Sequence, residues 1–133
     1  RAKSVAAFNL SPPMLKEKDI QAAILDYLQC DQRVQWAARF NVGASPSEYV
    51  DKQGRRKRYF VRWAPTGTPD ILGMLKGGCL LGIECKRPDG RVRPAQRAFL
   101  DAIADGQGLA IVARSVGDVI RDLDRFCQAR GAS

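Results

Sequence analysis

The sequence predicts an α/β fold in which helices flank a mixed β-sheet, with the elements in the order α-β-β-β-β-α-β-α. Some segments repeat apolar residues at helical spacing, whereas others alternate between apolar and polar residues. One short run, at residues 109–113, is wholly apolar, which is typical of a strand covered on both faces. The chain has 133 residues, about the length of one domain, and no internal repeat.

The first elements are a helix and a strand. A helix is expected at residues 15–30, where an apolar stripe includes Ile20, Ile24 and Leu28. A half-buried strand is expected at residues 33–42, because apolar residues alternate there. Its predicted buried face consists of Val34, Trp36, Ala38, Phe40 and Val42.

A basic loop is predicted next. Residues 43–58 are polar and end in four consecutive cations, so we expect a loop there. A second strand follows, with Tyr59, Val61 and Trp63 alternating. We expect the aromatic side chains of both strands to lie mostly in the core.

A β-hairpin is predicted from Asp70 to Lys86, because Gly77 and Gly78 form a strong turn signal. If residues 76–78 form a three-residue loop, Leu75 pairs with Cys79 and Asp70 lies opposite Glu84. Lys86 then shares the face of Glu84, because alternate residues of a strand point the same way. Leu81, Ile83 and Cys85 form the other, apolar face.

Two helices and a strand complete the fold. A helix at residues 94–105 begins with Pro94 and is ended by Gly106 and Gly108. The apolar strand at 109–113 follows it. The last helix, at residues 116–129, has an apolar side that includes Val119 and Leu123.

Composition narrows the possible chemistry. Lys and Arg number 22 and Asp and Glu 14, for a net charge of +8, which suggests a polyanionic partner. The absence of histidine excludes Ser-His-Asp and Cys-His catalysis and His-ligated zinc. None of the four cysteines forms a C-x-x-C pair, so we expect no zinc site and buried, reduced thiols in an intracellular protein. No apolar run approaches the ~18 residues of a membrane span.

The hairpin carries the candidate chemistry. Two facing carboxylates, Asp70 and Glu84, repel each other unless a cation lies between them, and oxygen ligands suit Mg²⁺ or Mn²⁺. Lys86 beside them can hold or activate a water. The alternative is a cross-strand salt bridge from Lys86 to Asp70 or Glu84 on a solvated face.

Two polar residues begin apolar helical stripes. Glu17 lies on the buried face of the first helix, and Gln96 occupies the equivalent place in the second. Glu17 either completes a metal site or favours the helix macrodipole near its N-terminus. Gln96 either positions water or phosphate or bonds to the backbone.

The sequence resembles a nuclease family. Gly67-Thr68-Pro69-Asp70-Ile71, Ile83-Glu84-Cys85-Lys86, Gly90-Arg91 and Pro94-Ala95-Gln96, together with Gly78 and Gly108, resemble the VRR-NUC branch of the PD-(D/E)xK nucleases. The likeness is to its small stand-alone phage and bacterial members, and it runs from about Glu17 to Phe126. It implies a restriction-endonuclease-like fold, with one nuclease domain at residues 15–133 after an N-terminal arm at 1–14.

The resemblance also implies roles for individual residues. Asp70, Glu84 and the backbone carbonyl of Cys85 match metal ligands, and Lys86 matches the catalytic lysine. Gln96 matches the family's motif glutamine and Glu17 its first-helix glutamate. Arg93 departs from the pattern, because the family usually has a serine there, which would cap the helix.

Two basic clusters are candidates for DNA contact. One is the loop with Arg55, Arg56, Lys57 and Arg58, joined by Lys52, and the other consists of Arg87, Arg91, Arg93 and Arg97. Both fit phosphate contact, and both also fit ordinary solvated charge. No recognition-helix pattern is visible, so we expect cutting directed by DNA structure rather than by sequence.

The leading hypothesis is a structure-specific, Mg²⁺- or Mn²⁺-dependent DNA endonuclease. As the resemblance implies, it is expected to act as a homodimer on branched DNA such as a four-way (Holliday) junction. It is expected in a bacterial cytoplasm, encoded by a bacterium, phage or prophage. The alternatives are a flap-cutting or nicking nuclease, a resolvase of the related archaeal type, and a non-catalytic DNA-binding module with a nuclease fold. A basic RNA-associated protein would leave the hairpin acids unexplained.

Overall fold

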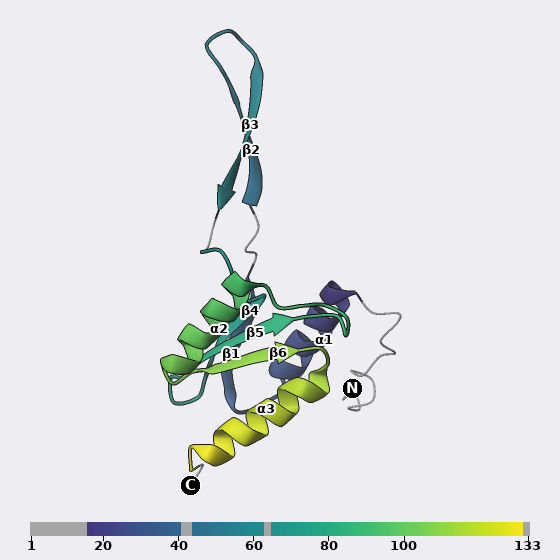
Figure 1. The fold of residues 1–133 in the computed structure, drawn as a ribbon, viewed down its shortest axis with the longest axis vertical. Coiled ribbons are helices and arrows are strands. Elements are labelled where there is room, and N and C mark those ends of the chain that lie inside the picture. The colour runs from purple at the N-terminus through teal and green to yellow at the C-terminus, as the bar shows by residue number, and fades with distance from the viewer. Residues whose placement is uncertain (1–15, 41–43, 63–64, 132–133) are drawn as a thin grey trace.

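A computed structural model of the chain describes residues 16–40, 44–62 and 65–131 (Figure 1). Within residues 44–62 it describes the side chains of residues 50–57 only. The predicted arm at 1–14 and residue Val42 lie outside the described residues. The elements are α1 (Glu17–Leu28), β1 (Val34–Arg39), β2 (Ala44–Val50), β3 (Arg56–Arg62), β4 (Ile71–Leu75), β5 (Leu80–Cys85), α2 (Pro94–Asp105), β6 (Leu109–Ala113) and α3 (Val116–Ala129).

Four strands form one mixed sheet in the order β1-β4-β5-β6. The pairs β1–β4 and β4–β5 are antiparallel, whereas β6 is parallel to β5 and is reached through α2. Strands β2 and β3 form a separate two-stranded sheet that extends away from this core (Figure 1). The predicted α/β class with a mixed, helix-flanked sheet is confirmed.

The main core lies between the sheet and helices α1 and α3. Apolar residues of both helices pack against the sheet face formed by Ile71, Leu81, Ile83 and Ile111, all of which are buried. The helical residues in this cluster are Ile20, Ile24, Leu28, Val116, Val119 and Leu123. Helix α2 covers the opposite face, where Ile103 packs closely over Gly82. Burial of each such side chain contributes about 1.5–3 kcal/mol to stability.

The predicted hairpin register is confirmed. Ile71 pairs with Ile83 and Met74 with Leu80, and the amide of Leu75 donates to the carbonyl of Cys79 at 2.8 Å. Continued by one residue, this register sets Asp70 opposite Glu84.

The predicted loop at residues 43–58 is wrong in its first half and at its end. Residues Ala44–Val50 form β2, which pairs with Arg56–Arg62 of β3 from Val50↔Arg56 to Ala44↔Arg62. The structure therefore has one strand more than the predicted order. β2 has the sequence ASPSEYV, which contains Pro46 and little apolar alternation, so its signal comes from its partner strand rather than from itself.

The predicted face of the first strand is also wrong. A β-bulge between Val34 and Trp36 shifts the alternation, so Val34 and Ala37 are half-buried against the core. Trp36 and Phe40 are 47% and 42% exposed instead of being core residues. The side chain of Tyr59 and all of Trp63 lie outside the described part of the chain.

The four cysteines differ in their burial. Cys85 is buried and Cys79 and Cys127 are half-buried, but Cys30 is exposed, contrary to the expectation that all four thiols are buried. In the described ranges, no helix is both long and apolar enough to cross a membrane.

Candidate active site

The candidate site is a row of residues across one end of the sheet. Asp70 immediately precedes β4, Glu84 lies in β5, and Lys86 directly follows β5. The Cys85 amide donates to Oδ2 of Asp70 at 2.8 Å, so the Asp70 carboxylate is fixed against the end of β5. The amide of Phe40 donates to the Asp70 carbonyl at 2.8 Å, which extends the row to β1.

Glu84 is the most deeply buried acid of the row, with 2% of the residue exposed. Its Oε2 accepts a hydrogen bond from Nε2 of Gln96 at 2.8 Å and lies 3.6 Å from Nζ of Lys86. Its Oε1 is buried without a hydrogen-bond partner among the described residues. Burial, and next the negative charge of Asp70, raise the pKa of Glu84 to about 8, against an opposing effect of Lys86.

This arrangement leaves a carboxylate oxygen whose desolvation is uncompensated. A buried polar atom without a partner costs about 1–3 kcal/mol, and more if it is charged. The salt bridge of the predicted alternative is present between Lys86 and Glu84, but it is not on a solvated face, because Lys86 is itself only 6% exposed. A cation beside Asp70 and Glu84 would satisfy the unpartnered oxygen and offset their repulsion, and two oxygen donors are the chemistry that Mg²⁺ or Mn²⁺ prefers.

Gln96 connects this row to the start of α2. Its Oε1 accepts a hydrogen bond from the Arg93 amide at 2.9 Å, while its Nε2 donates to Glu84. The backbone-bonding interpretation of Gln96 is therefore correct, and the same side chain also orients a site carboxylate. Helix α2 begins at Pro94 although Arg93 stands where the resembled family has serine, because Gln96 satisfies the amide at the N-cap.

The loop before Asp70 packs against the first turn of α2. Gly67 has a φ of +88°, and a Cβ there would lie within 3.0 Å of the Ala95 carbonyl group. Thr68 is buried, and its hydroxyl donates to the Pro65 carbonyl at 2.6 Å. Between this loop and α2 is a pocket of about 200 Å³ lined by Thr66, Gly67, Thr68, Asp70, Arg93, Ala95 and Gln96. Of the three central residues of the candidate site, Asp70 lines this pocket, whereas Glu84 and Lys86 do not.

Glu17 is placed near the site but does not join a compact acidic cluster. It is half-buried at the start of α1. Burial raises the pKa of the Cys85 thiol, and the charges of Asp70, Glu84 and then Glu17 raise it further, so Glu17 acts on the same end of the sheet. Among the described residues, no three His, Cys, Asp or Glu side chains are arranged to hold a metal ion. A ligand role for Glu17 therefore stays a prediction.

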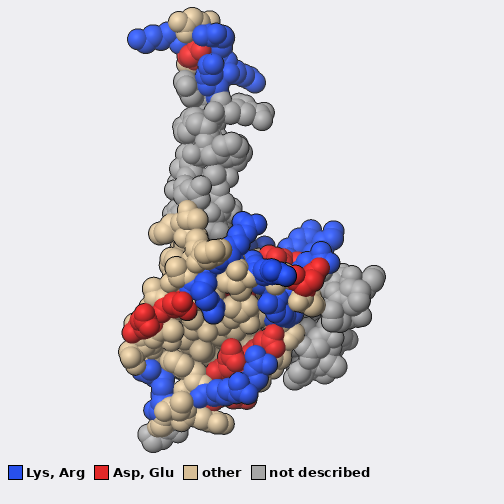
Figure 2. Space-filling model, in the orientation of Figure 1, with Lys and Arg blue, Asp and Glu red and all other residues tan. Residues whose placement is uncertain are grey.

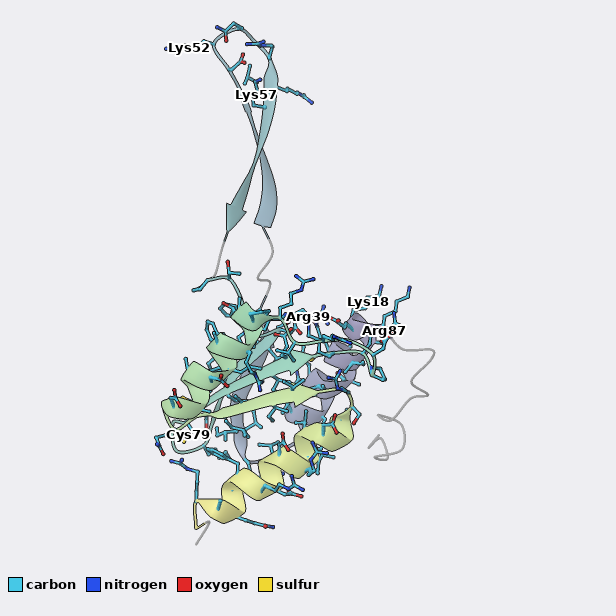
Figure 3. The ribbon with its side chains drawn as sticks, viewed as in Figure 1. Lys18, Arg39, Lys52, Lys57, Cys79 and Arg87 are labelled. Atoms are coloured by element: carbon cyan, nitrogen blue, oxygen red, sulfur yellow. The ribbon has the colours of Figure 1, made fainter. Side chains whose placement is uncertain are left out.

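Sequence reasoning missed two residues at this end of the core. Arg39, the last residue of β1, is exposed, and its charge acts on Cys85 against the three acids. Figure 3 shows Arg39 with Lys18 and Arg87 at the end of the core from which the β2–β3 hairpin extends. Arg114 donates from Nη1 to the carbonyls of Arg87 and Gly90 and so fixes the loop after β5. Arg39 could have been found as the cation at the carboxyl end of the predicted strand 33–42.

One predicted basic cluster lies at the tip of the β2–β3 hairpin (Figure 2). Asp51 organises this tip by accepting hydrogen bonds from the amides of Gln53 and Arg55 at 2.9 and 2.8 Å. Its Oδ2 also lies 3.2 Å from Nε of Arg55, which offsets one of the cations. Lys52, Arg55, Arg56 and Lys57 are all exposed, whereas the side chain of Arg58 lies outside the described residues.

The other predicted basic cluster surrounds the candidate site. Arg87 and Arg91 follow β5, and Arg93 and Arg97 lie at the start of α2, all of them exposed. Among the described residues, Arg87 and Arg97 form long ion pairs, at 3.7 and 3.9 Å, with exposed aspartates. Exposed pairs of this kind are weak, so these arginines keep their charge available to an anionic ligand.

Comparison with protein families identifies the domain. Residues 15–117 match the family model of the VRR-NUC domain, so the match covers most of the chain and all of the candidate site. The chain belongs to the VRR-NUC family. A search of curated proteins found no match. The mixed sheet with flanking helices is consistent with the restriction-endonuclease-like fold, and membership of the VRR-NUC family implies a nuclease that acts on DNA.

Proposed function

We propose that this VRR-NUC domain is a divalent-metal-dependent, structure-specific DNA endonuclease that hydrolyses phosphodiester bonds. The observation that carries the proposal is the buried, unpartnered Oε1 of Glu84 in a row with Asp70 and Lys86. A buried carboxylate beside a second, half-buried one is costly in the protein alone and is understandable as half of a cation site.

The residues present fit Mg²⁺ or Mn²⁺. Asp70, Glu84 and the backbone carbonyl of Cys85 are the proposed ligands, with Glu17 as a further one. When bound, such an ion supplies charge neutralisation at the scissile phosphate and acidifies water. Because Mg²⁺ keeps several waters and commonly shares phosphate oxygens, a site with few protein ligands suits a phosphodiester substrate.

Lys86 is proposed to orient the attacking water. Its Nζ has three donors, and the contact to Glu84 uses at most one of them. The water oxygen forms the new bond to phosphorus, and the P–O bond to the leaving nucleotide breaks. One water proton passes to solvent, and the leaving oxygen takes up a proton from solvent. Gln96 holds Glu84 in place during this step through its hydrogen bond.

The β2–β3 hairpin is proposed to contact DNA phosphates. Its strands β2 and β3 each have seven residues, which corresponds to about 23 Å of extended chain. The cations at its tip can therefore contact the backbone several base pairs from the cut, while the arginines around the site contact it close by.

The preferred substrate is proposed to be branched DNA. A four-way junction is the first candidate, because a symmetric homodimer would bring two equal sites to its two equivalent strands. A flap or a nicking site is the second candidate. A DNA-binding module without catalysis would not need the complete set of Asp70, Glu84 and Lys86.

Cleavage assays test the proposal. Asp70→Asn and Lys86→Met should abolish cutting of four-way, flap and linear DNA in Mg²⁺ or Mn²⁺, and a chelator should do the same to the unaltered protein. Asp105→Asn is the matched control, because this exposed acid is the last residue of α2, nine residues after Gln96. Full turnover by either site variant in a clean preparation would refute the assignment.

Charge reversal tests the hairpin contact. Arg56→Glu combined with Lys57→Glu should weaken DNA binding and lower the salt slope by about two. Lys76→Glu combined with Arg125→Glu changes the charge equally at exposed positions elsewhere and serves as control. An unchanged salt slope in the hairpin variant would contradict the contact.

A further inference from the structure

Strand β1 presents an exposed apolar strip beside the candidate site. Trp36 is 47% exposed and Phe40 is 42% exposed, and Ala38 between them is exposed as well. Large aromatic side chains gain most when they are covered, so such a pair on a sheet face indicates a surface used for binding.

The register places this strip on the catalytic face. Ala38 pairs with Leu72 and Arg39 with Ile71, and the bond from the Phe40 amide to the Asp70 carbonyl continues this ladder. Residues directly opposite in an antiparallel pair share a face, so Phe40, Asp70 and Glu84 lie side by side in one transverse row.

Trp36 belongs to the same face, because residues i and i+4 of a strand point the same way. The four residue steps between Trp36 and Phe40 correspond to about 13 Å. The bulge lies between Val34 and Trp36 and so leaves this segment regular. Two aromatic rings are thus spaced along the sheet edge, with the second one next to the carboxylates.

The surroundings favour a nucleic acid as the occupant. The cations on this face belong to α2: Arg93 is exposed and lines the pocket beside Asp70, and Arg97 is exposed one turn further along the helix. Arg39, between the two aromatic positions, points to the other face, because its partner across the strands is the core residue Ile71. Exposed aromatic rings combined with nearby cations are the pattern that binds unpaired strands, because each base has a π-face to stack on a ring. A continuous duplex keeps those faces stacked inside the helix and cannot offer them.

We propose that Trp36 and Phe40 form a stacking site for unpaired bases of the DNA strand whose phosphate lies at Asp70 and Glu84. This inference rests on the proposed function, which it deepens by naming unpaired nucleotides beside the cut as the feature that the enzyme selects. A flap, or a junction with splayed bases, supplies them, whereas a blunt duplex does not.

Tryptophan fluorescence tests the stacking site without any cleavage. The chain has two tryptophans, so Trp63→Phe leaves Trp36 as the only indole reporter. Titration with an oligothymidylate of about 12 nucleotides, in the presence of a chelator, should quench this signal, and a blunt duplex should quench it far less. Because no metal and no turnover are needed, failure of the nuclease proposal would not affect this readout.

Side-chain variants separate ring stacking from mere apolar contact. Trp36→Ala and Phe40→Ala should each weaken oligothymidylate binding about 5-fold or more, measured by anisotropy of a labelled strand. Trp36→Leu should be as weak as Trp36→Ala, whereas Trp36→Phe and Phe40→Tyr should restore most of the affinity. Cleavage by Trp36→Ala should fall more on flap DNA than on a linear duplex.

Three results would overturn the proposal. Equal quenching by a blunt duplex would show that unpaired bases are not what binds. Unchanged affinity in both alanine variants would remove the rings from the site. Loss of a dimer in sedimentation by Trp36→Ala, with unchanged oligonucleotide affinity, would assign the strip to contact between two copies of the chain.

Discussion

Replacement of Gly67 by alanine tests how the loop before Asp70 is held against α2. Gly67 combines a φ of +88° with a Cβ position that meets the Ala95 carbonyl group. Gly77 in the β4–β5 turn has a similar φ of +98°, but a Cβ there would meet nothing within 4 Å. The two glycines therefore share the backbone strain and differ in the close contact.

The expected magnitudes follow from this difference. A left-handed conformation costs alanine about 1–2 kcal/mol relative to glycine, so Gly77→Ala should lose about that much stability. The contact with the helix backbone adds about 1–3 kcal/mol at Gly67, because main-chain atoms cannot move aside as a flexible side chain can. At about 4 °C per kcal/mol, Gly67→Ala should have the lower melting temperature by about 4–12 °C.

Thermal unfolding followed by circular dichroism measures the stability difference, and a cleavage assay at a temperature where both variants are folded measures the function. Gly67→Ala should also cut more slowly than Gly77→Ala. The loop must shift to relieve the clash between the new Cβ and the Ala95 carbonyl group, and this shift moves Asp70 relative to Gln96. Equal melting temperatures for the two variants would refute the close-contact argument. Equal cleavage rates would show that the loop position does not govern the site.

Three further predictions follow from the hydrogen bonds and pKa values. Gln96→Ala should destabilise the fold by about 1–3 kcal/mol, measured by urea unfolding, because Glu84 loses its amide donor. In chelator, the free energy of unfolding should fall as pH rises from near 4.5 to about 8, since the folded state binds the Glu84 proton more tightly than the unfolded state. Glu84→Gln should flatten that pH profile. Burial opposes ionisation of Asp31, but hydrogen bonds from Arg33 and Tyr27 lower its pKa to about 2. The stability from this group is therefore present above about pH 4 and lost as pH falls toward 2, and Asp31→Asn should remove this acid dependence.

The hairpin that carries the site was predictable because its signals are local. Gly77 and Gly78 fix the turn, and the alternation from Cys79 to Cys85 allows only one buried face, so the position of Asp70 opposite Glu84 follows from chain geometry. The burial of Glu84 did not follow, because it depends on the covering of that face by α2. The double role of Gln96 was missed for the same reason: only the docked helix brings its amide to the carboxylate.

The errors have a common physical origin in interactions distant along the chain. β2 is polar and contains Pro46, and it becomes a strand because β3 supplies its hydrogen-bond partners. The β-bulge in β1 exchanges the faces of Trp36 and Ala37, and no residue near it is a typical marker of a bulge. Alternation in the sequence therefore predicted a strand correctly and its buried face wrongly.

The hydrogen bond between Phe40 and Asp70 closes a loop of about 30 residues that contains the whole β2–β3 hairpin. Each doubling of such a loop costs only about 0.6 kcal/mol of closure entropy, so the arm can be lengthened, shortened or exchanged at little cost to the four-stranded sheet. The constraint falls instead on the segment from Gly67 to Asp70, which must return to its place against α2. Under the proposed function, reach along the DNA and chemistry at the phosphate would then be separately adjustable properties of one short chain. An arm of different length on the same core would change where the protein holds its substrate and leave its cutting chemistry intact.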